Sequence, residues 1–267
     1  MKIPAMGFGT FRLEGDVAYQ SVLNALKAGY RHIDTAQIYG NEAEVGQAIV
    51  DSGINRQDIF LTTKVWNDNL SHDKFEQSVR ESLSKLKTDY IDLLLIHWPA
   101  PPQGTSLADA TNSLVAVKEQ SLTKAIGVSN FTIAQMDEIQ PALGDHKLLT
   151  NQIEVHPYLT NDSVRNYCRE NQILVTGYMP FAVGKVLNDN VVTAIAKGHQ
   201  CTPAQVIIAW TQANNLITIP SSTKVNNIEA NLVGLDITLS RDEIQLINQL
   251  NCNDRIAAPD FSPVWDK

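Results

Sequence analysis

Two side chains that could take part in acid–base chemistry lie five residues apart near the N-terminus. In residues 29–46, GYRHIDTAQIYGNEAEVG, a strand-like run ends at Asp34, and Tyr39 follows in a small polar loop. A carboxylate and a phenol at one strand end offer a proton acceptor and a proton donor. Both also have ordinary structural interpretations, because Asp34 could be a buried ion-pair partner and Tyr39 could pack or lie on a rim.

Polar side chains also mark other strand-like runs. Lys64 ends the third run and His97 ends the fourth. Because an unpaired buried charge is costly, Lys64 needs a partner, and Asp34 could supply it. Taken singly, Lys64 with Asp34 would be interpreted as a buried ion pair and His97 as a satisfied core residue. The later runs begin or end with Ser129 and Asn130, Asn151 and Gln152, Tyr178, and residues 220–224.

Eight strand-like runs alternate with helix-like runs along the chain. We place the strands at residues 6–10, 31–35, 59–64, 91–97, 125–129, 151–155, 173–178 and 217–220. Several runs are continuously apolar, as is typical of parallel strands covered by helices. The pattern predicts the α/β class and a closed (β/α)8 TIM barrel, with residues 1–267 as a single domain. The loops after the strands of such a barrel form one face, so the polar strand ends should converge there.

The composition narrows the class of protein. The 267 residues are 43% hydrophobic and 19% charged, which is ordinary for a globular protein with a large core. A formal net charge of -8 argues against broad binding to nucleic acid or to an anionic membrane. No apolar run is long enough for a signal peptide or a membrane span, so we expect a cytoplasmic protein. The three cysteines are far apart, and neither they nor the histidines show metal-ligand spacing, so no metal site is expected.

Three motifs carry a family resemblance. Residues 29–46 resemble the first signature of the aldo-keto reductase family, and residues 126–131, IGVSNF, resemble its mid-chain signature. Residues 219–222, IPSS, with Asn231 resemble the family's C-terminal cofactor motif in weaker form. Shorter matches follow in the same order at residues 3–11, 95–99 and 151–154. The resemblance covers nearly the whole chain and, within the family, is greatest to the compact bacterial 2,5-diketo-D-gluconate reductases of the B type, which are also described as methylglyoxal reductases.

The resemblance implies an enzyme with the catalytic tetrad Asp34, Tyr39, Lys64 and His97. As hydride reaches a carbonyl carbon, negative charge develops on the oxygen, which needs a proton donor in place. Tyr39 would be this donor, and the Lys64 ammonium would stabilise its phenolate. Asp34 would hold Lys64 and compensate its charge, while His97 would orient the carbonyl and contribute to proton transfer.

A hydride carrier is required because protein side chains supply none, and the resemblance implies NADPH. The resemblance places Ser129, Asn130 and Gln152 against the carboxamide of the nicotinamide and Tyr178 on the nicotinamide ring. Tyr178 could instead fill the barrel mouth. The other implied cofactor contacts are Gly9, Thr10, Phe11, Asp34, Pro180, Phe181, Ser222, Thr223, Lys224 and Asn231.

The region expected to hold the adenosine phosphate departs from the family pattern. Ser221 replaces a usual lysine and Asn227 replaces a usual arginine, which removes one strong phosphate contact. Lys224 could replace part of this charge, or it could be a surface lysine without a ligand. We therefore expect NADPH as the cofactor and leave NADH use open.

The implied substrate contacts are Tyr39, Trp66, His97 and Trp98. Phe11 and Trp265 could extend an aromatic wall, although each tryptophan could also be ordinary barrel packing. A short tail and a modest loop after Trp98 favour a small, open pocket. Suitable substrates would be small aldehydes, α-dicarbonyls such as methylglyoxal, or keto-sugar acids such as 2,5-diketo-D-gluconate, which would give 2-keto-L-gulonate.

Both ends of the chain leave questions open. Residues 259–265 form an extended aromatic tail that could cover the barrel mouth or be an unremarkable terminus. Only residues 2–5 precede the first strand, where family members usually carry a hairpin that plugs the barrel bottom, so that end must be sealed otherwise.

We expect a monomer. A nicotinamide-binding sensor or partner subunit with little turnover is the rival function, whereas a hydrolase lacks a paired-carboxylate or metal arrangement.

Overall fold

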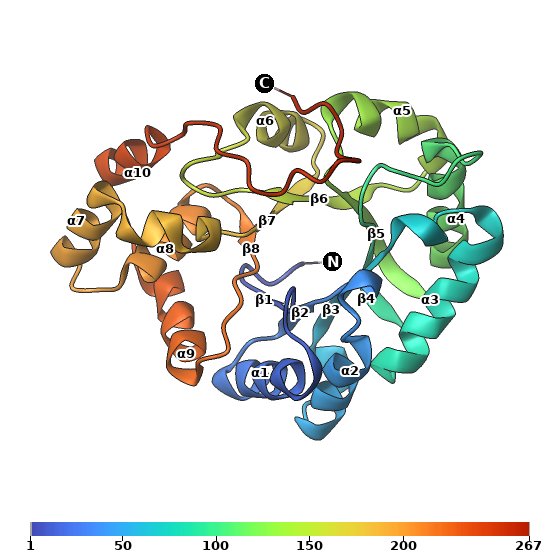
Figure 1. Ribbon diagram of the computed structural model, residues 1–267, viewed down its shortest axis with the longest axis horizontal. Coiled ribbons are helices and arrows are strands. Elements are labelled where there is room, and N and C mark those ends of the chain that lie inside the picture. The colour runs from blue at the N-terminus through green and yellow to red at the C-terminus, as the bar shows by residue number, and fades with distance from the viewer. Residues whose placement is uncertain (1, 267) are drawn as a thin grey trace.

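Eight parallel strands form one sheet in the computed structural model, which describes residues 2–266 (Figure 1). Along the sheet they are β1 Phe8–Gly9, β2 His32–Asp34, β3 Phe60–Val65, β4 Ile91–Ile96, β5 Thr123–Ser129, β6 Leu148–Glu154, β7 Leu174–Tyr178 and β8 Ile217–Thr218. Hydrogen bonds from Gly7 N to Thr218 O (2.8 Å) and from Thr218 N to Ala5 O (3.1 Å) join β8 to the β1 segment. The prediction of an α/β fold with a (β/α)8 TIM barrel is confirmed.

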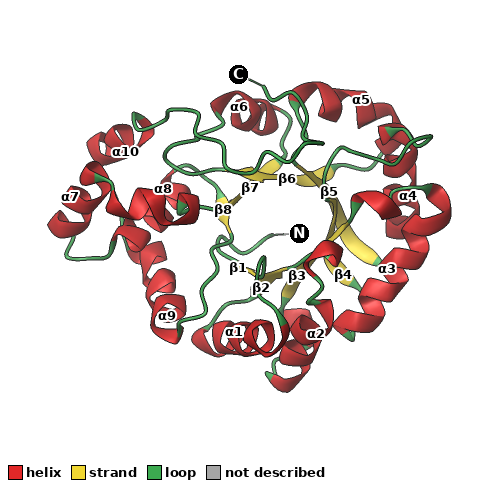
Figure 2. Ribbon diagram, in the orientation of Figure 1, coloured by secondary structure: helices red, strands yellow, loops and turns green. Residues whose placement is uncertain are grey.

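Helices surround the barrel (Figure 2). They are α1 Gly15–Ala28, α2 Glu42–Asp51, α3 His72–Leu86, α4 Leu107–Glu119, α5 Ile133–Leu143, α6 Asp162–Glu170, α7 Asn190–Gly198, α8 Pro203–Ala213, α9 Val225–Val233 and α10 Arg241–Asn248. Short 3-10 helices are η1 Gln37–Tyr39, η2 Arg56–Asp58, η3 Asn67–Asn69, η4 Ala182–Asn188 and η5 Gly234–Asp236. Among the described helices, none is both long and apolar enough to cross a membrane.

All eight strands lie where they were predicted, but their lengths differ. The regular parts of β1 and β8 are shorter than residues 6–10 and 217–220, because pairing continues there through irregular bonds such as Gly9 N to Pro220 O (3.0 Å). β5 begins at Thr123 and β6 at Leu148, which is earlier than expected. Polar residues at these two strand starts, such as Lys124 and Thr150, interrupt the apolar signal.

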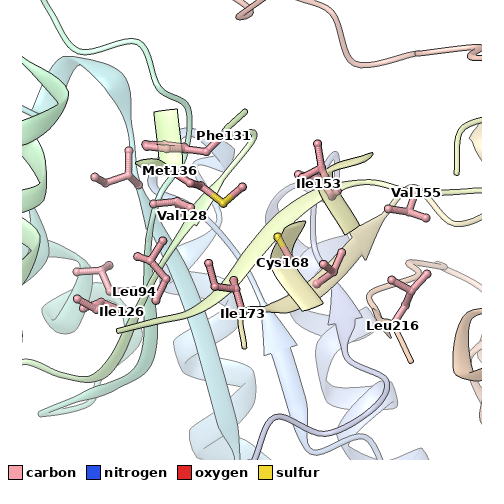
Figure 3. Close-up of a cluster of buried hydrophobic side chains, with 14 of the residues drawn as sticks. Leu94, Ile126, Val128, Phe131, Met136, Ile153, Val155, Cys168, Ile173 and Leu216 are labelled. Atoms are coloured by element: carbon pink, nitrogen blue, oxygen red, sulfur yellow. The ribbon is translucent and has the colours of Figure 1, made fainter. Parts of the chain in front are cut away.

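The largest hydrophobic cluster lies between the outer face of the sheet and the helices. Figure 3 shows residues of β4, β5 and β6 beside Met136 of α5 and Cys168 of α6. On β4, Leu94 belongs to this cluster, whereas Leu93 and Leu95 belong to a separate cluster inside the barrel. Burial on both faces explains why the strands are continuously apolar.

The barrel interior is apolar at the bottom and polar at the top. The interior cluster contains Ile3, Phe60, Leu93, Leu95, Ala125 and Ile217. Ile3 comes from the segment before β1, which enters the barrel as the N-terminus near the centre of Figure 1. This segment helps to seal the end of the barrel that was expected to be closed without a hairpin. Because inward side chains alternate along a strand, the same face of β3 leads from Phe60 to Lys64.

Candidate active site

A cavity of about 950 Å³ lies at the carboxyl ends of the strands. Its lining includes these predicted site residues: Gly9, Phe11, Asp34, Tyr39, Trp66, His97, Trp98, Ser129, Asn130, Gln152, Tyr178, Pro180, Phe181, Ser222 and Asn231. Lys64 is fully buried beside the cavity and contacts Asp34 and Tyr39. The polar ends of strands far apart in sequence therefore converge on one space, as the barrel topology requires.

Asp34, Lys64 and Tyr39 form one hydrogen-bonded chain. Lys64 Nζ donates to Asp34 Oδ1 (2.6 Å), Thr35 O (2.9 Å) and Tyr39 Oη (3.4 Å). The side chains of Lys64 and Asp34 are 0% and 2% exposed, so each compensates the other's charge in place of water. Asp34 Oδ2 accepts a further hydrogen bond from Gln152 Nε2 (2.7 Å) across the barrel. Asp34 is thereby fixed from two sides.

Burial and neighbouring charge set the protonation of these groups. Burial raises the pKa of Tyr39 above its ordinary value, and the nearby Lys64 ammonium offsets this only in part. Burial is the largest influence on Lys64 and disfavours its charged form, but the Asp34 carboxylate and Tyr39 together outweigh it, so the pKa of Lys64 lies above its ordinary value. Burial, followed by the charge of Lys64, holds the pKa of His97 well below its ordinary value. At neutral pH the site therefore contains a neutral phenol, an ammonium and a neutral imidazole.

The rings of Tyr39, His97 and Trp66 meet at this end of the cavity. The ring centroids of Tyr39 and His97 are 5.6 Å apart, and those of Trp66 and His97 are 5.3 Å apart, both in edge-to-face geometry. His97 Nδ1 has no hydrogen-bond partner among the described residues. A phenol and an imidazole facing one space can both donate a hydrogen bond to a developing oxyanion.

Helix η1 is held in place by Gln37, which the sequence did not identify as a site residue. Gln37 Oε1 accepts from Trp66 N (2.9 Å), and Gln37 Nε2 donates to the hydroxyls of Ser78 (3.1 Å) and Ser82 (3.2 Å) on α3. These bonds tie the segment that carries Tyr39 to the loop after β3 and to α3. In the sequence, the only feature that could have pointed to this role of Gln37 was its position two residues before Tyr39.

The side chains predicted to meet a carboxamide are hydrogen-bonded to their surroundings. Tyr178 Oη donates to Asn130 Oδ1 (2.8 Å), and Asn130 Nδ2 donates to His97 O (3.1 Å). Ser129 Oγ donates to Gln152 O (2.8 Å). Burial raises the pKa of Tyr178 well above its ordinary value, so this phenol keeps its proton. Together these residues form a fixed polar wall that carries the flat ring of Tyr178.

Three predicted cofactor contacts lie outside the cavity lining. Thr10 is fully buried, and its hydroxyl donates to Asp34 O (3.0 Å), so its position supports Asp34. Thr223 and Lys224 are exposed just before α9, beyond Ser222, which does line the cavity. The sequence could not separate these residues from the lining residues because each lies within two positions of one.

Several lining residues were not predicted. Among the described residues that line the cavity, Arg12 carries the one positive charge, and its guanidinium lies 5.0 Å from the Phe11 ring centroid. Arg12 could have been found from its place beside Phe11. The others are Ile38, Met179, Val183, Gly184, Leu187, residues 202–204, Ile219, Pro220, Ser221, Asn227, Ala230 and residues 256–259. Most of these come from loops without a chemical signature.

The C-terminal segment, residues 253–266, runs over the ends of β6 and β7 at one side of the barrel mouth and is here called the strap (Figure 1). Residues 256–259 of the strap line the cavity. Phe261 packs edge-on against Trp66 and Trp98, with ring centroids 5.8 and 5.5 Å apart. Trp265 contacts Trp98 at 6.0 Å. Of the two interpretations of the tail, the structure supports the one in which it covers the mouth, but it covers only one side, and Phe261 rather than Trp265 lies beside Trp66.

Comparisons with known proteins agree on one family. Residues 5–252 match the sequence profile of the Aldo/keto reductase family. Over 267 residues, 100% of both chains, the protein is 48% identical to methylglyoxal reductase DkgB of Salmonella typhimurium. It is 37% identical over 257 residues to glyoxal reductase of Bacillus subtilis, which covers 96% of this chain and 92% of that one. A crystal structure provisionally described as a 2,5-diketo-D-gluconic acid reductase B matches with a TM-score of 0.95 and 43% identity, covering 99% of this chain and 94% of the other.

Proposed function

The chain belongs to the aldo/keto reductase family, and from this premise we propose that it uses NADPH to reduce small aldehydes, α-dicarbonyls such as methylglyoxal, and keto-sugar acids such as 2,5-diketo-D-gluconate. The names of its relatives, methylglyoxal reductase and glyoxal reductase, support the α-dicarbonyl class. The observation that carries the proposal is the position of Lys64 Nζ, 2.6 Å from Asp34 Oδ1 and 3.4 Å from Tyr39 Oη.

The cavity suits a nicotinamide dinucleotide together with a small substrate. Its lining extends from Tyr39 and His97 to Ser222 and Asn231, and about 950 Å³ is far more than a three-carbon dicarbonyl fills. When bound, NADPH supplies the hydride. The Tyr178 ring would support the nicotinamide, and Arg12 would balance part of the phosphate charge.

The residues of the chain then supply the proton and hold the carbonyl. Tyr39 keeps its proton at neutral pH and donates it to the oxygen as negative charge develops there. Lys64 stabilises the phenolate that remains, and Asp34 keeps the ammonium within reach of Tyr39. Neutral His97 orients the carbonyl oxygen toward the phenol.

The decisive experiment follows the loss of reduced-cofactor absorbance with methylglyoxal, 2,5-diketo-D-gluconate and benzaldehyde. We expect turnover with NADPH, most readily with methylglyoxal. Tight cofactor binding without turnover of any carbonyl would contradict the proposal and would favour a cofactor-binding sensor.

Tyr39→Phe should lower kcat at least about 100-fold, because it removes the positioned proton donor. NADPH affinity should remain nearly unchanged when measured by fluorescence titration. Tyr19→Phe is the matched control, since Tyr19 hydrogen-bonds Asp51 at an exposed site on α1. Normal turnover in Tyr39→Phe would refute the role of this phenol.

Lys224→Ala tests the cofactor preference. Lys224 is exposed and follows the cavity residue Ser222 closely, with Lys224 N donating to Ser222 Oγ (3.1 Å). If Lys224 pairs with the 2'-phosphate, its loss should raise the KM for NADPH about fivefold or more and leave the KM for NADH unchanged. Lys197→Ala on α7 is the control. Equal effects on both cofactors would contradict this role.

A further inference from the structure

Glu154, the last residue of β6, is a buried carboxylate that the proposed reaction does not use. It is 0% exposed. Its Oε1 accepts from Ile256 N (2.8 Å), its Oε2 accepts from Ala257 N (2.7 Å), and His156 Nε2 lies 2.8 Å from Oε1. A buried carboxylate needs such donors, because burial of an unpaired charge is costly. Since two of the donors are consecutive backbone N–H groups of the strap, the carboxylate clamps the strap to the barrel.

Further contacts hold the strap on both sides of this clamp. Asn161, the residue before α6, donates from Nδ2 to Glu154 O (2.6 Å) and accepts at Oδ1 from Arg255 Nη2 (2.9 Å). The Arg255 guanidinium lies 3.8 Å from the ring centroid of Trp265, farther along the strap. The strap is therefore folded back on itself around the point where Glu154 holds it.

From the clamp the strap leads directly into the wall of the substrate pocket. Ala257 lines the cavity, and Phe261 packs on Trp66 and Trp98, which line it as well. Tyr39 is held by other elements, namely η1 and the Lys64 side chain of β3. Displacement of the strap would change the aromatic wall and leave the proton donor in place.

We propose that Glu154 is a positioning residue that sets substrate selectivity by fixing the strap, and with it Phe261, over the pocket. The kinetic part of this inference rests on the proposed carbonyl reductase activity, whereas the clamp itself does not. If Glu154 served only to support β6, its loss would weaken the whole barrel and affect all substrates equally.

Glu154→Gln is the first test. Glutamine keeps the size of the side chain but has one acceptor oxygen, so one of the two strap N–H groups loses its partner. Hydrogen–deuterium exchange of a peptide covering residues 253–262 should rise, while exchange in β4 stays unchanged. The KM for benzaldehyde should increase about tenfold, which corresponds to roughly 1.4 kcal/mol. The kcat values and the KM for methylglyoxal should stay within about twofold, because this three-carbon molecule has far fewer atoms that could contact the strap than benzaldehyde has.

Two further variants separate the clamp from its consequences. Glu138→Gln makes the same chemical change at an exposed position on α5 and should alter neither exchange nor kinetics. Phe261→Ala removes the aromatic contact but leaves the clamp, so it should raise the KM for benzaldehyde without raising exchange at residues 256–257. If Glu154→Gln and Phe261→Ala both raise the KM for benzaldehyde without raising that for methylglyoxal, Glu154 acts on selectivity through the position of Phe261.

The inference is overturned if exchange in the strap is unchanged in Glu154→Gln, or if exchange rises throughout the barrel and both KM values rise together. If Glu154→Gln does not fold, Ala257→Pro decides, because it removes the N–H that donates to Oε2 without changing any barrel side chain. Raised exchange elsewhere in the strap would support the clamp and unchanged exchange would refute it; KM does not decide for this variant, because Ala257 itself lines the cavity. Failure of the wild-type protein to reduce any carbonyl would refute the proposed function, while exchange would still decide the clamp.

Discussion

Tyr39, Lys64 and His97 are each kept in one protonation state across neutral pH. Burial raises the pKa of Tyr39 and lowers that of His97, so both side chains stay neutral. The Asp34 carboxylate and Tyr39 together outweigh the effect of burial on Lys64 and keep it charged. This arrangement favours the forms that the proposed reduction would need, which are a phenol with its proton, a neighbouring ammonium and a neutral imidazole.

The rate of reduction should therefore be insensitive to pH near neutrality. The pKa of Tyr39 and that of Lys64 lie above their ordinary values near 10, and that of His97 lies below its ordinary value of 6.5, so kcat/KM should stay constant between about pH 6 and 9. Steady-state kinetics with methylglyoxal at saturating NADPH would check this, with circular dichroism as the control for unfolding. A decline with a midpoint near pH 7 would mean that one of these groups titrates in the free enzyme.

At the scale of elements, α2 packs unusually closely on α3. A Cβ atom added at Gly46 would lie 2.5 Å from Lys85 O and 2.6 Å from Leu86 Cα. The same helix carries Glu42, whose carboxylate accepts a hydrogen bond from Thr63 Oγ1 (2.6 Å), next to Lys64 on β3. The absence of a side chain at Gly46 therefore lets α2 pack closely on α3, next to the strand that carries Lys64.

Gly46→Ala should lower the free energy of unfolding by about 1–3 kcal/mol, because the added methyl group meets backbone that cannot move aside easily. The matched control is Gly198→Ala, where an added Cβ meets no atom within 4 Å. This variant should be neutral or slightly stabilising, because alanine restricts the unfolded chain. Urea unfolding of both variants would check the difference. Equal stability of the two would show that α2 can shift without cost.

At the scale of the whole molecule, the segments at the two ends of the chain lie at opposite ends of the barrel. Ile3 joins the apolar cluster at the bottom, and the strap lines one side of the cavity at the mouth. Between them the barrel interior holds buried polar groups such as His32, which points inward from β2 and is 1% exposed. Stability of the whole fold therefore depends on keeping these groups in their neutral or paired forms.

The folded protein should lose stability as the pH falls from about 6.5 to 4. Burial lowers the pKa of His32 from 6.5 to about 4, so between these values the unfolded chain binds a proton that the folded chain does not. This group alone should lower the free energy of unfolding by about 2 kcal/mol between pH 7 and pH 5, and His97 adds to the loss with the same sign. Urea unfolding of His32→Gln should show a shallower pH dependence than the wild type. His72→Gln, at an exposed position, should leave the dependence unchanged, and an unchanged slope in His32→Gln would refute the prediction.

The sequence by itself determined the class of fold and the end of the barrel at which the polar strand ends gather. Apolar runs at regular intervals predicted eight parallel strands, since burial on both faces leaves a local trace in each strand. Asp34 and Tyr39 are neighbours in sequence, and Lys64 lies at a strand end, where the barrel topology brings side chains together. These features depend on local pattern and topology, which a single chain displays directly.

The tertiary structure alone decided the contacts between distant segments. The bond from Gln152 to Asp34 joins residues 118 positions apart, and the clamp from Glu154 to the strap joins residues about a hundred positions apart. The strap has no periodicity because its partners are single groups, a carboxylate and two aromatic rings, rather than a regular face. Such contacts depend on strand register and barrel curvature, so the covering of the mouth by Phe261 follows from the closed barrel and not from the tail's own sequence.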